Sequence, residues 1–150
     1  MKHLLQKYSF FQGHEHLNSS EIEKLKKLLA VTDDNVIGQY EETFALLIGS
    51  GSAVSYASAR MAFHEIMATI GVSSGDEVIV LGFTCAVMAN AVLRRGGNLV
   101  YSDVDPKTFG SCPKSIQQKI SPNTKVVVAQ HSFGIPCKIQ EIKEVCKRAG

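Results

Sequence analysis

The chain alternates between short apolar runs and longer segments in which apolar residues recur at every third or fourth position. From residue 53 onward the short runs predict four strands, at 53–57, 77–81, 98–103 and 125–130. The run EVIVL at 77–81 is almost entirely apolar, which is typical of a strand covered on both faces. Strands that alternate with helices in this way predict a parallel or mostly parallel sheet between helical layers.

Apolar residues at helical spacing predict the helices between and before these strands. The expected stripes are Ile22, Leu25, Leu28 and Leu29; Tyr40, Phe44 and Leu47, within a helix over 39–47; Ala59, Ala62, Phe63, Ile66 and Ile70; Ile116 and Ile120; and Ile139, Ile142, Cys146 and Ala149. A further helix is expected over 84–95. Ser20 and Glu23 predict a capping box at the first helix. Gly71, Gly96 and Gly150 are placed to end helices.

The expected fold class is therefore α/β, a three-layer αβα arrangement with a mostly parallel sheet. Residues 1–150 are expected to form one partial domain, with a helical segment at 1–50 and a βαβαβαβα portion at 51–150. In such sheets ligands bind outside the carboxyl ends of the strands. This rule directs attention to 56–60, 81–85, 103–105 and 130–134.

Composition narrows the function classes. The 150 residues include 16 basic and 14 acidic side chains, a net charge of +2, and the basic residues are scattered. No nucleic-acid partner is therefore expected. There is no apolar run of 18 residues, and residues 1–16 lack the apolar core of a signal peptide, so neither membrane insertion nor secretion is expected. The four cysteines form no Cys-x-x-Cys pair, and free thiols in the cytoplasm are expected.

The segment Ser58-Ala59-Arg60 carries the clearest chemical signal. Ser58 follows an expected strand and is placed to cap the next helix, whose first backbone N–H groups lack intrahelical partners and attract anions. An arginine in the first helical turn opposes the helix dipole, which makes better sense beside a bound phosphate. The alternative is a plain helix cap with an exposed arginine.

Other candidates have simpler readings. Residues 49–52 (GSGS) follow a helix and precede a strand, so they predict a turn and not a dinucleotide fingerprint. Thr84 could cap the helix at 84–95, and Cys85 has no neighbouring base that would make it a nucleophile. Asp103 and Asp105 could bind a metal, although Asp105-Pro106 is more typical of a turn. His131 either contacts a ligand or is hydrogen-bonded within its loop.

Several ordered segments resemble the DegT/DnrJ/StrS family of sugar aminotransferases, which use pyridoxal 5'-phosphate (PLP). The strand GDEVIV at 75–80 is the family's sequence unaltered. The other matching segments are 38–44, 58–63, 83–85 with 89–92, 103–109 and 130–136. Together they cover the chain from about residue 10 to 150.

The resemblance implies the large domain of a fold-type-I PLP enzyme, truncated here. Ser58, Ala59 and Arg60 would hold the cofactor phosphate, and Cys85 would lie over the pyridine ring, where the family normally has an aromatic residue. His131 is the remaining candidate for a cofactor contact. The implied reaction transfers an amino group from an amino-acid donor, glutamate by expectation, to a keto-sugar that is nucleotide-linked. A cytoplasmic homodimer, or association with the missing C-terminal half, is expected.

Two family residues have no counterpart in these 150 positions: the aspartate that pairs with the pyridinium nitrogen and the lysine that forms the Schiff base. The chain is therefore expected to be incomplete as an enzyme on its own. One alternative is a non-catalytic remnant or partner-binding α/β domain that binds a phosphate ligand. A nucleotide-sugar oxidoreductase is another, and the missing glycine fingerprint argues against it.

Overall fold

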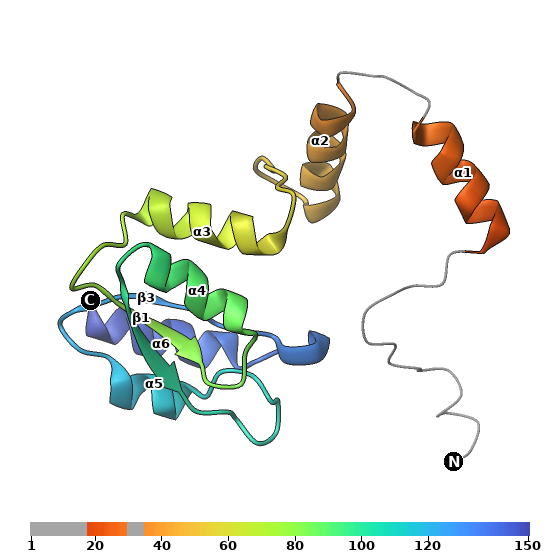
Figure 1. The fold of residues 1–150 in the computed structure, drawn as a ribbon. Coiled ribbons are helices and arrows are strands. Elements are labelled where there is room, and N and C mark those ends of the chain that lie inside the picture. Colours follow the sequence, from red (N-terminus) through yellow and green to blue (C-terminus); the bar gives the residue numbers. More distant parts are fainter. Residues whose placement is uncertain (1–17, 30–34) are drawn as a thin grey trace, which may run out of the picture. The chain divides into compact units, whose positions relative to one another are not determined.

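The computed structural model describes residues 18–29 and 35–150, and it divides the chain into two compact units, Met1–Val54 and Ser55–Gly150 (Figure 1). The stretch 1–16 considered for a signal peptide lies outside the described residues, as do the side chains of Leu28 and Leu29. Each unit is described by itself.

In the first unit, helix α1 (Ser19–Leu29) begins with a capping box, but not the predicted one. The N–H of Glu21 donates to Asn18 Oδ1 at 3.1 Å, and the N–H of Asn18 donates to Glu21 Oε2 at 2.8 Å. Asparagine is as good an N-cap as serine, and the Asn18–Glu21 pair has the same spacing as the expected Ser20–Glu23 pair. The predicted box was therefore two residues too late.

Helix α2 (Val36–Ile48) begins three residues before the predicted start at 39. Tyr40 and Phe44 share a face as expected, with ring centroids 6.0 Å apart. The helix ends at Gly49, which adopts a left-handed φ of 104° and donates its N–H to the Ala45 carbonyl. The turn expected at 49–52 therefore does end a helix. The strand predicted at 53–57 does not follow it, because this segment has no strand partner among the described residues and Val54 is largely exposed.

The second unit contains a three-stranded parallel sheet in the order β2-β1-β3. Its strands are β1 (Glu77–Leu81), β2 (Asn98–Ser102) and β3 (Thr124–Val127). The prediction for β1 is correct at both ends, whereas β2 ends one residue early. The strand β3 ends three residues before the predicted 130, because the backbone there leaves the ladder and Gln130 N–H donates instead to Ser111 Oγ.

The helices of this unit confirm the periodicity. They are α3 (Ala59–Ile70), α4 (Ala86–Arg94), α5 (Pro113–Lys119) and α6 (Ile139–Ala149), with a short 3-10 helix η1 (Ser132–Gly134). Gly71 caps α3 in the left-handed conformation, as predicted. Of the described helices, none combines the length and apolar character that crossing a bilayer requires.

Strand β1 separates two hydrophobic cores. Val78 and Val80 face α3 and α4, where they pack with a cluster that includes Met67. Ile79, which alternates with them, faces α5 and α6 and packs with a cluster that includes Ile116. Side chains of successive strand residues point to opposite faces, so this alternation requires a helical layer on each side of the sheet. The predicted three-layer αβα arrangement is confirmed (Figure 1).

Candidate functional site

A cavity of about 220 Å³ lies where β1 and β3 end. We call it the carboxyl-end cavity. Its lining residues come from the loop after β1 and from the segment after β3, and they are Phe83, Thr84, Cys85, Gln130, Ser132 and Phe133. The location agrees with the rule that ligands of parallel α/β sheets bind beyond the carboxyl ends of strands. The predicted site residue Cys85 therefore lines the expected place.

Gln130 connects the two loops of this cavity through both ends of its side-chain amide. Thr84 Oγ1 donates to Gln130 Oε1 at 2.6 Å, and Gln130 Nε2 donates to Ser132 Oγ at 3.2 Å. The predicted capping role of Thr84 is thus wrong, because its hydroxyl is directed to Gln130. Cys85 occupies the N-cap of α4 and makes no side-chain cap hydrogen bond.

Two exposed aromatic rings, one from each loop, meet at the cavity. The centroids of Phe83 and Phe133 are 6.0 Å apart, and the ring planes are inclined at 51°. Phe133 has a φ of 55°, in the left-handed region that non-glycine residues rarely occupy. Such backbone conformations are concentrated at functional sites, where the surrounding structure must hold them.

His131 follows Gln130 in sequence but is not among the residues that line the cavity. Its Nδ1 accepts the backbone N–H of Cys137 at 2.9 Å. A neutral imidazole in this bond carries its proton on Nε2. The structure thus contains the loop hydrogen bond that was one of the two alternatives for His131, and a cofactor contact by this residue stays a prediction.

The segment Ser58-Ala59-Arg60 begins α3 as predicted. Ser58 is the N-cap, and its Oγ accepts the N–H of Met61 at 3.3 Å. Within the described residues, the N–H groups of Ala59 and Arg60 have no acceptor, as expected in the first helical turn. In Figure 1 the start of α3 lies on the same side of the second unit as the start of α4 and η1. The start of α3 thus lies on the side of the unit where the strands have their carboxyl ends.

The side chain of Arg60 lines a different cavity, of about 270 Å³, between α3 and α4. Arg94 near the end of α4 lines the same space, together with His64 and Asn90. The backbone and the side chain of Arg60 thus adjoin separate features. The single anion site predicted from the sequence is therefore divided between two places.

The acidic pair after β2 forms a turn. Asp105 is only 4% exposed, and its Oδ1 accepts the N–H groups of Lys107 and Thr108. Its Oδ2 accepts Lys138 Nζ at 2.7 Å. The hydrogen bond from Lys138 lowers the pKa of Asp105 and raises the pKa of Lys138. The carboxylate of Asp105 is therefore fully engaged, which supports the turn and not the metal site. In the described part of the chain, no three histidine, cysteine or acidic residues are grouped to hold a metal ion.

The four cysteines are all free thiols. Cys85 is exposed, whereas burial raises the pKa of both the Cys137 and the Cys146 thiol. A raised thiol pKa lowers the fraction of reactive thiolate. Of these three thiols, that of Cys85 is the exposed one, and it lines the carboxyl-end cavity.

A family model and individual relatives both match this chain, and they point to the same family of proteins. The sequence model of the DegT/DnrJ/EryC1/StrS aminotransferase family matches residues 15–150. The chain is 29% identical over 114 residues to GDP-perosamine synthase of Vibrio cholerae, covering 76% of the chain and 31% of that relative. It is 33% identical over 112 residues to GDP-perosamine synthase of Caulobacter vibrioides, covering 75% and 30%. The chain thus spans just under a third of the length of these relatives.

A solved structure agrees. NtdA of Bacillus subtilis, with bound cofactor PMP, superposes with a TM-score of 0.82 at 27% identity, over 88% of this chain and 32% of that one. The α/β fold described above is therefore shared with part of NtdA.

Proposed function

This chain belongs to the DegT/DnrJ/EryC1/StrS aminotransferase family, and we propose that it is part of a sugar aminotransferase. In this proposal the chain provides the turn that binds the phosphate of the cofactor and one wall of the cavity that holds the cofactor ring. The observation that carries the proposal is the start of α3. There the N–H groups of Ala59 and Arg60 have no acceptor in the described structure, and they lie at the end of the sheet where ligands bind.

The residues at this end fit PLP in two respects. Ser58, Ala59 and Arg60 offer N–H groups and the positive end of a helix dipole to a phosphate. Cys85 and Phe83 line a cavity whose other wall carries Phe133, and sulfur and aromatic groups both make favourable contacts with a π-face. A planar, phosphorylated ligand matches this combination of an anion site and an apolar cavity.

The names of the relatives support a proposal for the substrate class. Those named above are GDP-perosamine synthases, so the amino acceptor we propose is a nucleotide-linked keto-sugar, with an amino acid such as glutamate as donor. When bound, PLP supplies an electron sink for this transfer. The contribution of this chain is to bind and orient the phosphate and to exclude water from one side of the ring.

The proton-transfer group must come from elsewhere. Among the described residues, no lysine lines the carboxyl-end cavity. Lys138 is paired with Asp105. Lys125 lies near the start of β3, at the opposite end of the sheet, where it is paired with Asp76. We propose that a segment that carries the family's lysine and aspartate completes the site.

Cofactor binding is tested by equilibrium dialysis of the purified chain with PLP, with pyridoxal and with inorganic phosphate. We expect one PLP per chain and clearly weaker binding of pyridoxal, which has no phosphate. Arg60→Glu reverses the charge in the first turn of α3, which carries the free N–H groups, and should weaken PLP and phosphate binding at least about tenfold through the changed electrostatic potential. Arg94→Glu is the matched control, because Arg94 lines the α3–α4 cavity but lies at the far end of α4.

Equal binding of PLP and pyridoxal would overturn the phosphate turn, and unchanged PLP affinity in Arg60→Glu would remove Arg60 from it. Catalysis is tested by incubating the chain with PLP, glutamate and a nucleotide-linked keto-sugar. We expect no amino sugar by mass spectrometry from the chain alone. Formation of that product would contradict the view that the lysine must be supplied by another segment.

A further inference from the structure

We propose that Gln130 is a positioning residue that holds the two walls of the carboxyl-end cavity at a fixed separation, and thereby sets the affinity for the ring of a planar ligand. This inference rests on the proposed function for the identity of that ligand. The role of Gln130 in holding the walls rests on hydrogen bonds alone.

The side chain of Gln130 joins segments that are distant in sequence. Thr84, which donates to its Oε1, is 46 positions away and belongs to the loop after β1. Its Nε2 donates to Ser132 Oγ, in η1, and at 3.5 Å to the carbonyl of Phe83. One amide group therefore connects the Phe83–Thr84 wall to the Ser132–Phe133 wall.

The chemistry of the partners fixes which way this amide points. The Phe83 carbonyl can only accept a hydrogen bond, so it requires the NH₂ end of the amide. The Thr84 hydroxyl then meets the oxygen end and donates to it at 2.6 Å. A side chain with only acceptors or only donors cannot satisfy both contacts. Glutamine suits this position, and an apolar residue of the same length would leave both walls unlinked.

The backbone beneath Gln130 is also fixed. Its N–H donates to Ser111 Oγ at 3.1 Å, and that hydroxyl donates to the Val128 carbonyl at 3.2 Å. A Cβ on Gly110 would lie 2.6 Å from the carbonyl oxygen of Gln130, so the backbone of Gly110 packs closely against that carbonyl and only glycine fits there. Because its backbone is held by these hydrogen bonds, the side chain of Gln130 can hold both loops in a defined position.

By joining the two walls, Gln130 fixes the relative position of the Phe83 and Phe133 rings. Gln130 binds the carbonyl of Phe83 and the hydroxyl of Ser132, the neighbour of Phe133, and the two ring centroids are 6.0 Å apart. Phe133 holds a left-handed φ of 55°, which needs support from its surroundings. The hydrogen bond to Ser132, next to Phe133 in sequence, supplies part of that support.

The test compares Gln130→Met, which keeps the length and removes both hydrogen-bonding ends, with Gln130→Glu, which keeps the acceptor for Thr84. Gln118→Met on the exposed face of α5 is the matched control. Hydrogen exchange is followed without ligand at the amides of Met88 and Ile135, which close the turns at Cys85 and Ser132. Affinities for PLP and for inorganic phosphate are measured in parallel.

For Gln130→Met we expect exchange at both amides to be about tenfold faster and PLP affinity to be about fivefold to tenfold lower, with phosphate affinity within about twofold of wild type. Gln130→Glu should lie between, since the Thr84 contact survives. General destabilisation would lower PLP and phosphate affinity together, so the separation of the two identifies positioning.

Unchanged exchange in folded Gln130→Met would overturn the inference. So would PLP affinity that is unchanged, or that falls in proportion to phosphate affinity. If the wild-type chain binds no PLP, the proposed function fails, and the exchange measurement alone decides whether Gln130 holds the walls.

Discussion

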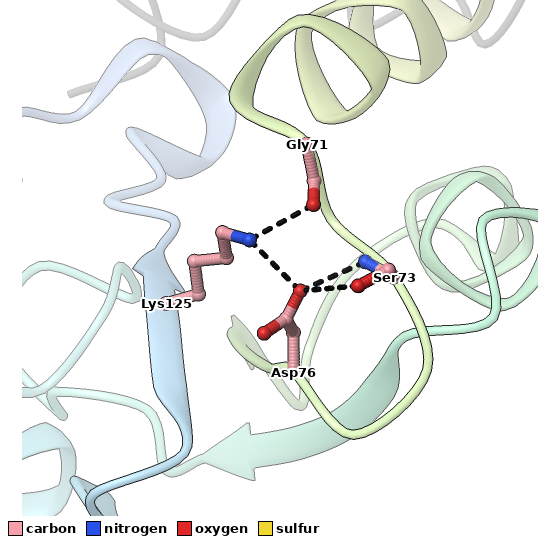
Figure 2. Close-up of polar contacts among 4 residues, drawn as sticks. All are labelled: Gly71, Ser73, Asp76 and Lys125. Carbon is pink, nitrogen blue, oxygen red and sulfur yellow. Dashed lines mark hydrogen bonds and ion pairs between the residues drawn. The ribbon is translucent and has the colours of Figure 1, made fainter.

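The two ends of the sheet in the second unit are built differently. At the amino end, Lys125 Nζ donates to the Gly71 carbonyl at 2.8 Å and pairs with Asp76 Oδ2 at 3.0 Å (Figure 2). The same carboxylate oxygen accepts the N–H and the hydroxyl of Ser73. At the carboxyl end, two phenylalanine rings are exposed beside a cavity, and the first N–H groups of α3 lack acceptors in the described structure.

The amino-end cluster is closed because each of its four residues, Gly71, Ser73, Asp76 and Lys125, binds another member. A register shift contributes: Glu77 pairs with Thr124 and Val78 with Val126, so Lys125 is the extra residue of a bulge. Bulges redirect side chains, and this lysine reaches the turn that leads from α3 to β1. The contrast indicates that the amino end maintains the fold and leaves ligand-binding groups to the carboxyl end.

The largest effect on stability is expected from a substitution at Gly110, which packs closely against the backbone of Gln130 at the carboxyl end. A Cβ on Gly110 would lie 2.6 Å from the Gln130 carbonyl oxygen and 2.8 Å from Cys137 Cβ. Gly110→Ala should therefore lower the free energy of unfolding by about 3 kcal/mol, as overpacking against backbone does. Urea denaturation measures this change.

Gly134→Ala is the matched control for Gly110→Ala. Gly134 has a φ of 77° with open space around its Cβ position, so its substitution should cost only about 1 kcal/mol from backbone strain. If Gly110→Ala lowers the free energy of unfolding by no more than Gly134→Ala does, the close packing of Gly110 against Gln130 does not hold the backbone below the cavity in place.

A smaller effect is expected at the start of α3. Ser58→Ala removes the side-chain acceptor of the Met61 N–H, which keeps the Ser58 carbonyl at 3.0 Å, and should lower the free energy of unfolding by about 1 kcal/mol. Ser58→Gly should cost only a few tenths of that. Because a phosphate would bind the free N–H groups, PLP should stabilise the wild-type chain in thermal unfolding and stabilise Ser58→Ala less. Equal stabilisation of both proteins would show that Ser58 does not shape the anion site.

Much of the fold could be predicted because it depends on local pattern. The EVIVL run of β1 has one consistent interpretation, and both its bounds were correct. The strand at 53–57 was wrong because a strand needs a partner, and apolar pattern alone does not supply one. The cap at Asn18 was missed because Asn18-Glu21 and Ser20-Glu23 have the same spacing, so sequence alone does not decide between them.

The site was predicted in outline but not in its connections. Cys85 and the start of α3 lie at the end of the sheet where the sequence places them. Gln130 lies in the predicted segment 130–134, but its connecting role was missed because its partner Thr84 is 46 positions away, and no local rule relates the two. The available signal was a polar residue at the end of an apolar run, which needs a partner if it is partly buried. The bulge that directs Lys125 toward Gly71 and Asp76 could not be predicted in this way, because no feature of the neighbouring sequence indicates it.

The smallest effect concerns pH and the amino-end cluster. The hydrogen bond from Lys125, and then the backbone N–H of Ser73, lower the pKa of Asp76 below its usual 3.8. A lowered folded-state pKa means that Asp76 adds stability above about pH 4 and loses it as pH falls through the folded value. Asp76→Asn should therefore be less stable than wild type at pH 7 and approach it in acid.

Wild type and Asp76→Asn are compared by urea denaturation between pH 7 and pH 3, with Asp105→Asn as the control at the other end of the sheet. Asp105 also has a lowered pKa, through Lys138, so each variant should keep the acid dependence that the other loses. PLP affinity should be unchanged in Asp76→Asn, because its cluster is closed and lies away from the cavity. A variant that loses PLP binding while it remains folded at pH 7 would break the division between a structural amino end and a ligand-binding carboxyl end.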